Sequence, residues 1–141
     1  MSNKAKKTIL LILIILTIAF IFGNSLENRQ SSAQISTAVY SVVSRMLPFI
    51  SHKLLRKMAH FFEFMVLGSE LVLYLHLCNK KIEYAVIIGM MAGAIDETIQ
   101  YFVGRYASIL DVLLDTSGVV IALLLFKYLI FPYLIKKESN S

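Results

Sequence analysis

The residues best suited to chemistry lie in two short stretches of the chain. The first, RKMAHFFE, runs from Arg56 to Glu63, and the second, DETIQYFVGRYASILDVLLD, runs from Asp96 to Asp115. A histidine beside a glutamate can transfer protons, grouped carboxylates can hold a hard divalent cation, and arginine or lysine suits a phosphate. The candidates for catalysis are His60, Glu63, Asp96 and Glu97, and those for ligand binding are Arg56, Lys57, Gln100, Arg105, Asp111 and Asp115.

The chain around these candidates is apolar enough to lie in a membrane. Of its 141 residues, 57% are hydrophobic and only 16% are charged, and the mean hydropathy is +0.71. Several nearly uncharged stretches approach the roughly 20 residues that a membrane-spanning helix needs. We therefore predict a single all-α membrane domain over residues 1–141, with four transmembrane helices at about residues 8–26, 58–78, 84–103 and 108–131.

The loop after the first span carries a further amphipathic pattern. Apolar residues recur at helical spacing over residues 35–47, serine and threonine fill the other face, and Pro48 ends the pattern. This predicts a helix on the outer surface of the membrane, either as an interfacial anchor or as a cover over the site.

Lysine and arginine positions favour a cytoplasmic N-terminus and C-terminus in a multi-pass protein of the cell membrane. The compact turn from Asn79 to Glu83 holds two lysines, and lysines also flank both ends of the chain. We expect the first span to be retained rather than cleaved as a signal peptide, because the other spans need an orienting first helix. Lysines beside anionic headgroups account for much of the net charge of +5, so no nucleic-acid partner is expected.

The polar residues inside the predicted spans form one stripe on each helix. Asp96 and Gln100 share a face, as do Asp111 and Asp115. A charged side chain costs about 2.5 to 3.5 kcal/mol at the bilayer centre, so these stripes should face one another, water or a cation. Most of the stripe residues lie in the predicted outer half of the membrane, and the small residues Gly93 and Gly118 lie on the same faces. Together they predict an interior polar pocket that opens outward.

Both stretches resemble the VanZ-like family. In the first part of the family pattern, a basic residue and a histidine precede an aromatic-rich helix, and the matching segment is RKMAHFFEFMVLGSE. The second part has Asp-Glu-x-x-Gln, a Gly-Arg turn, and an aspartate before a small-residue helix. Its matching segment is DETIQYFVGRYASILDVLLDTSG. The segment FGNSLENRQSS is similar to the family's polar exit from its first helix. Phe64 departs from the pattern, because a tyrosine is common there. The resemblance implies a teicoplanin-resistance-associated envelope protein, since the family is named for a member that lowers sensitivity to this glycopeptide antibiotic.

Three functions remain open at this point. The pocket could bind a lipid headgroup or a lipid-linked envelope precursor and so modulate glycopeptide susceptibility. It could instead be the site of an intramembrane enzyme acting on a phosphate-bearing envelope substrate, with His60 and Glu63 as the acid/base pair and Asp96, Glu97 and Asp111 orienting them. The third alternative is a proton-coupled carrier that uses Glu70 and Asp96. No cofactor is expected, except that a divalent cation at the carboxylate cluster stays open.

Structural roles are also open for some candidates. Ser108-x-x-Asp111 fits a capping box at the start of the last span. Asp115 could pair with Arg105 or Lys57 and simply join helices, and the Gly104-Arg105 pair could form only a turn.

Overall fold

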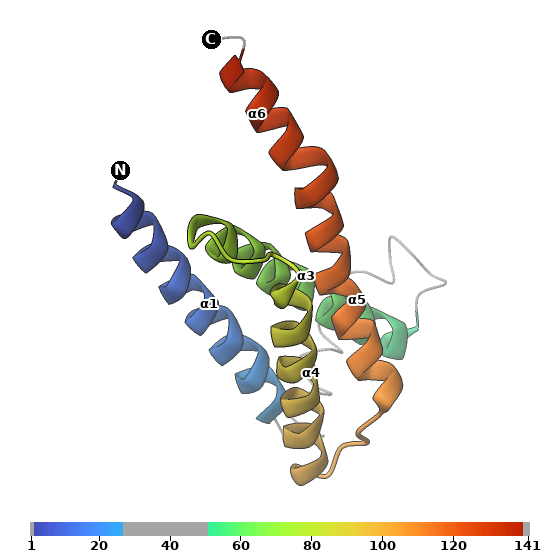
Figure 1. Cartoon of the computed structure of the whole chain (residues 1–141). Coiled ribbons are helices and arrows are strands. Elements are labelled where there is room, and N and C mark those ends of the chain that lie inside the picture. Colours follow the sequence, from blue (N-terminus) through green and yellow to red (C-terminus); the bar gives the residue numbers. More distant parts are fainter. Residues whose placement is uncertain (1, 27–50, 140–141) are drawn as a thin grey trace.

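The computed structural model describes residues 2–26 and 51–139, and these residues form helices joined by short connections (Figure 1). The helices are α1 (Asn3–Leu26), α3 (His52–Leu77), α4 (Tyr84–Phe102), α5 (Ile109–Leu125), the π-helical turn η1 (Phe126–Ile130) and α6 (Phe131–Ser139). The helices α5, η1 and α6 follow one another without a break and make one long rod (Figure 1). No strand occurs in the part of the chain that the structure describes, so the prediction of an all-α fold is confirmed there.

Three helical stretches are long and apolar enough to cross a membrane: Asn3–Leu26, Lys53–Leu77 and Ile109–Leu134. The span expected at residues 84–103 coincides with α4, but α4 is not among these three, because Asp96, Glu97 and Gln100 lower its hydropathy. The count of four spans therefore stays a prediction. The surface helix expected at residues 35–47 lies outside the described residues.

Large apolar side chains cover the outer faces of the helices. On α1, Ile15, Leu16 and Phe20 are each more than half exposed. Such a surface is unfavourable in water and suits the hydrocarbon of a bilayer. The exposed apolar faces therefore agree with the membrane assignment.

Glycines allow α5 to lie very close to its neighbours. A Cβ added to Gly118 of α5 would stand 2.5 Å from the carbonyl oxygen of Phe61, and one added to Gly68 of α3 would stand 2.8 Å from the Cα of Val119. A Cβ on Gly89 of α4 would stand 2.6 Å from a methyl carbon of Val119. Small residues are the usual means of close helix contact in membranes. Gly89 and Gly118 thus confirm that the predicted small-residue faces are contact faces.

Residues with positive φ end two of the helices. Asn79, with φ of 54°, follows the C-cap of α3, and Gly104, with φ of 78°, follows the C-cap of α4. After α4, Gly104 N–H donates to the Tyr101 carbonyl at 3.1 Å and Arg105 N–H donates to the Gln100 carbonyl at 2.9 Å. This pair of bonds is a Schellman motif, which needs a residue that tolerates a left-handed backbone. The predicted Gly-Arg turn is confirmed, and it folds Arg105 back toward α4.

Four helix ends meet at one end of the molecule. Hydrogen bonds join the last turn of α1 to α3 and α4, and an ion pair joins the second turn of α3 to the first turn of α5. In Figure 1 the connection between α4 and α5 lies at the bottom, while both chain ends lie at the top. The polar candidate residues lie where these helix ends meet.

Candidate functional site

Three buried carboxylates from two helices lie together where the helix ends meet. Asp96 is fully buried, and Glu97 and Asp115 are exposed by only 6% and 2%. Each of these residues offers a carboxylate oxygen, and the three oxygens lie within 4.8 Å of one another. We call Asp96, Glu97 and Asp115 the carboxylate cluster. Their mutual repulsion in a low-dielectric setting must be offset by protons, by hydrogen bonds or by a cation.

Gln100 connects the carboxylate cluster to α1. Its Nε2 donates to Asp96 Oδ2 at 2.7 Å and to Ser25 Oγ at 3.4 Å. Asp96 and Gln100 lie four residues apart on α4, so helix geometry places both on the same face. The predicted polar stripe of this helix is therefore confirmed as an interior stripe.

Glu97 joins the end of α4 to the start of α5. Its Oε2 accepts a hydrogen bond from the backbone N–H of Ser108 at 2.7 Å. Ser108 is the N-cap of α5, and its hydroxyl accepts from the N–H of Leu110 at 3.2 Å. Only half of the expected capping box is present, because Glu97 and not Asp111 takes the N–H of Ser108. Asp111 is thereby available to another partner.

That partner is Lys57, whose ammonium group forms an ion pair with the Asp111 carboxylate across α3 and α5. Both side chains are partly exposed. On the next turn of α3, His60 Nδ1 lies 3.3 Å from Glu63 Oε2, and Glu63 Oε1 accepts from Asn24 Nδ2 at the same distance. Lys57 and His60 thus have acidic partners, on α5 and within α3 itself.

Arg105 lies at the end of α1. It is buried, and its Nη1 donates to the carbonyl oxygen of Asn24 at 3.5 Å. The Schellman turn after α4 places it there, so the helix end positions a cation within the protein.

A cavity of about 10 Å³ lies among the candidates, with room for about one water molecule or one small ion. Its lining includes seven of the ten predicted site residues: Arg56, Lys57, His60, Glu97, Gln100, Asp111 and Asp115. Of the other three, Asp96 belongs to the carboxylate cluster, Glu63 lies beside His60, and Arg105 contacts α1. The structure therefore brings the predicted residues to one region.

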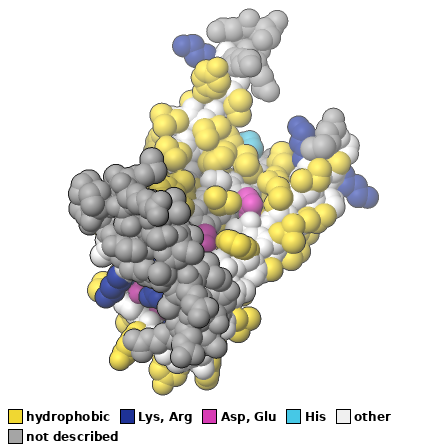
Figure 2. All heavy atoms as spheres, turned by 180° about the vertical axis from the view of Figure 1, so that it is seen from behind, with side chains coloured by type: hydrophobic (Ala, Val, Ile, Leu, Met, Phe, Trp, Pro, Cys, Tyr) yellow, Lys and Arg dark blue, Asp and Glu magenta, His cyan; other side chains and the backbone are white. Residues whose placement is uncertain are grey.

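A larger hollow lies between α1 and α3. It has a volume of about 410 Å³ and is lined mostly by apolar side chains, with Thr17 and Glu63 as its polar members. Seen from behind, acidic side chains show at the surface among hydrophobic ones (Figure 2). Glu70 lies further along α3 and accepts a hydrogen bond from Thr17 at 3.0 Å, so it does not join the carboxylate cluster.

Sequence reasoning missed several polar contacts of the candidate residues and of Glu70. Asn24 and Ser25 of α1 contact Glu63 and Gln100, Thr17 contacts Glu70, and the backbone of Ser108 contacts Glu97. The polar exit from the first helix was the signal for Asn24 and Ser25. For Thr17 the signal was weaker, since it was a lone hydroxyl in an apolar helix.

Away from the carboxylate cluster, Lys127 pairs with Glu83 of the connection between α3 and α4 at a distance of 2.8 Å. The hydrogen bond from the Lys127 ammonium group lowers the pKa of the Glu83 carboxyl. Glu83 is therefore an ionised carboxylate with a partner of its own, which makes it a useful control.

Comparison with known proteins identifies one family. The sequence model of the VanZ/LLP1 family matches residues 9–132, which is most of the chain. No curated protein and no solved structure matches it.

Proposed function

The chain belongs to the VanZ/LLP1 family, and from that membership and the polar site we propose that it is an envelope protein that lowers susceptibility to glycopeptides such as teicoplanin. In this proposal the polar site opens to the outer side of the cell membrane. It binds the phosphate-bearing headgroup of a lipid or of a lipid-linked envelope precursor.

The observation that carries this proposal is the placement of Arg56. Its side chain is exposed and lines the small cavity together with Lys57 and Asp111. Lys57 is neutralised by Asp111, whereas Arg56 forms no ion pair within residues 2–26 and 51–139. A guanidinium group offers forked donors that match a phosphate. Arg56 is thus a phosphate-binding group at the mouth of the site.

The hollow between α1 and α3 suits the hydrocarbon part of the same ligand. It is lined by Leu13, Leu16, Phe20 and Val66, and Glu63 lies at its polar edge beside His60. Because His60 lines the small cavity and Glu63 lines the hollow, the polar and apolar parts of the site are neighbours. An amphipathic lipid can therefore contact both.

The test is teicoplanin susceptibility in a sensitive Gram-positive host. The wild type is expected to raise the minimum inhibitory concentration, and Arg56→Gln is expected to lose most of the increase. A charge-assisted hydrogen bond contributes about 1.5 to 3 kcal/mol, which is about tenfold or more in affinity. Lys53→Gln is the matched control. Like Arg56, Lys53 is an exposed cation near the start of α3, but it does not line the cavity.

Membrane abundance is measured in parallel for each variant. If Arg56→Gln is as abundant as the wild type and confers the same tolerance, the headgroup role of Arg56 is rejected. If the wild type leaves susceptibility unchanged, the glycopeptide function itself is rejected.

An enzymatic function is the second proposal, and the pair of His60 and Glu63 favours it. At 3.3 Å the pair is slightly longer than a hydrogen bond, as catalytic pairs often are before substrate binds. The hollow beside Glu63 would hold the hydrocarbon part of a phosphate-bearing lipid. Purified protein that releases phosphate from such a lipid, with loss of release in Glu63→Gln, would support catalysis. Binding without turnover would leave the first proposal.

A further inference from the structure

The carboxylate cluster holds more negative charge than its neighbours offset. Asp96, Glu97 and Asp115 are buried together, while Lys57 faces Asp111 and His60 faces Glu63. Buried carboxylates are normally paired with a cation or coordinate a metal, because desolvation strongly disfavours an isolated charge. His60 also interacts electrostatically with Asp96 and Asp115, but a single imidazolium cannot offset three carboxylates.

Unpartnered oxygens in the same place give a second, independent indication. Asp96 Oδ1 is fully buried and has no hydrogen-bond partner among the residues that the structure describes. Asp115 is exposed by only 2%, lines the small cavity, and accepts no hydrogen bond from the described residues. Buried polar groups almost always have a partner in native proteins. An unpartnered oxygen of Asp96 beside an Asp115 carboxylate that has no donor among the described residues indicates a ligand between them.

The donor set and the space define the class of that ligand. Carboxylate oxygens form the cluster, and Gln100 holds one of them through the hydrogen bond from its Nε2 to Asp96 Oδ2. Oxygen donors suit Mg²⁺, Ca²⁺ and Mn²⁺. The cavity of about 10 Å³ has room for one such ion or one water molecule, but not for an organic cation.

We propose that Asp96, Glu97 and Asp115 together bind one hard divalent cation, with Gln100 holding Asp96 in place beside it. The cation neutralises the cluster and places positive charge close to Arg56. A phosphate can then be held between the cation and the guanidinium group. The phosphate-binding role of the cation rests on the proposed headgroup function. Cation binding itself is measured with no phosphate-bearing lipid present.

The test is a titration of the purified full-length protein with Mn²⁺ in a phosphate-free maltoside detergent, after removal of metals with a chelator. Free Mn²⁺ is followed by electron paramagnetic resonance. We expect one saturable site per chain. Asp115→Asn and Glu97→Gln should each weaken the Mn²⁺ affinity. The decrease should exceed the roughly 10- to 100-fold decrease that loss of an outer-shell partner typically causes. Glu83→Gln is the control, because Glu83 is an exposed carboxylate that pairs with Lys127, and it should bind as the wild type does.

Thermal unfolding without metal separates loss of the site from loss of the fold. Removing one of three like charges should leave both variants at least as stable as the wild type. Glu97→Gln is the gentler variant, since its amide oxygen can still accept from Ser108 N–H. Absence of a saturable site in folded wild type, or unchanged binding in both folded variants, would overturn the cation site. Mn²⁺ binding together with unaltered teicoplanin tolerance in Arg56→Gln would keep the cation site and remove the headgroup role.

Discussion

Asp111 and Asp115 show how two similar residues on one helix face can have opposite energetic roles. Asp111 is partly exposed and is paired with Lys57 across α3 and α5. Asp115, one turn deeper, is almost fully buried and has like-charged neighbours in Asp96 and Glu97. Neutralising the first removes an attraction, whereas neutralising the second removes a repulsion.

Asp111→Asn should therefore lower the free energy of unfolding, and Asp115→Asn should leave it unchanged or raise it. The loss for Asp111→Asn should be about 0.5 to 1 kcal/mol, since the pair with Lys57 is partly exposed and screened. The measurement is thermal unfolding in detergent with a chelator present. A larger loss for Asp115→Asn than for Asp111→Asn would mean that the Asp115 charge already has a stabilising partner.

The identity of the polar residues was predictable, but their partners were not. The 3.6-residue period placed Asp96 and Gln100 on one face, and the structure confirms this with a hydrogen bond between them. The pairing of Lys57 with Asp111 and the contact of Gln100 with Ser25 depend on the rotation and crossing of separate helices. Periodicity within one helix carries no information about either quantity.

At the scale of helices, the close contact of α3 and α5 positions the basic residues of one against the carboxylates of the other. Gly118 of α5 lies against the backbone of Phe61 and Met65 in α3. His60 and Asp115 lie within three residues of this contact on their own helices. The spacing of small residues predicted a contact face on α5, but it did not show which helix would occupy that face.

Gly118→Ala should destabilise the protein although alanine favours a helix. Its Cβ would stand 2.5 Å from the Phe61 carbonyl oxygen and 3.1 Å from the Met65 nitrogen, so one of the helices must shift. We expect a cost of about 1 to 3 kcal/mol, as for other overpacked sites. Gly23→Ala in α1 is the control, because no atom lies within 4 Å of its added Cβ, and it should be neutral or stabilising.

Thermal unfolding and membrane abundance check both glycine variants. If Gly118→Ala and Gly23→Ala behave alike, α3 and α5 are not in the close contact that the structure shows.

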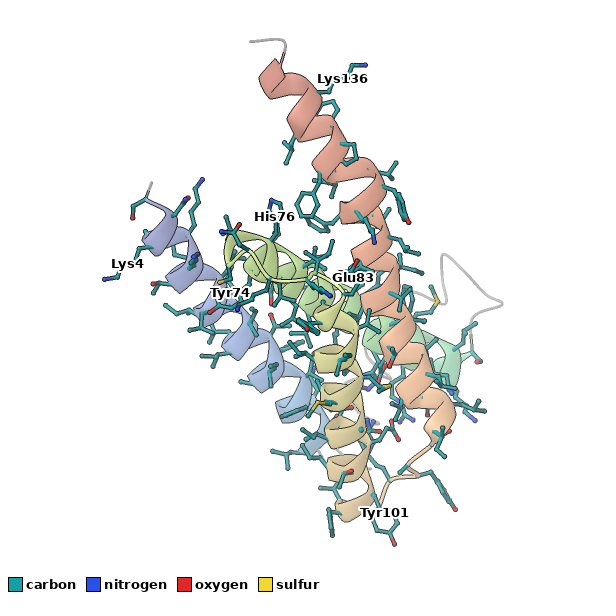
Figure 3. The ribbon with its side chains drawn as sticks, viewed as in Figure 1. Lys4, Tyr74, His76, Glu83, Tyr101 and Lys136 are labelled. Atoms are coloured by element: carbon teal, nitrogen blue, oxygen red, sulfur yellow. The ribbon has the colours of Figure 1, made fainter. Side chains whose placement is uncertain are left out.

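At the scale of the whole molecule, a few labelled side chains mark the two ends. Lys4 and Lys136 lie at one end, and Tyr101 lies at the other, beside the connection between α4 and α5 (Figure 3). Lysines near a cytoplasmic surface and aromatic residues at an interface are typical of membrane proteins. With the chain ends in the cytoplasm, the four helix ends that form the site would face outward.

The membrane character was predictable from hydropathy, whereas the number of spans was less so. The span expected at residues 84–103 is a helix in the structure, yet it is not among the three stretches that are long and apolar enough to cross a membrane. Hydropathy describes the free energy of transferring a segment to lipid, whereas α4 packs its polar face against α1 and α5. A helix that supplies a buried polar site is for this reason the hardest to identify as a span.

The most direct test of an outward-facing site is cysteine labelling in intact cells with a membrane-impermeant maleimide. The background is Cys78→Ser, which removes the only native cysteine. Ala107→Cys reports on the connection between α4 and α5, where Ala107 is exposed and, unlike Gly104, has no positive φ. Ser2→Cys reports on the N-terminal end. The account predicts that Ala107→Cys is labelled from outside and that Ser2→Cys is labelled only after the cells are opened; the reverse pattern would place the site on the cytoplasmic side and contradict the account.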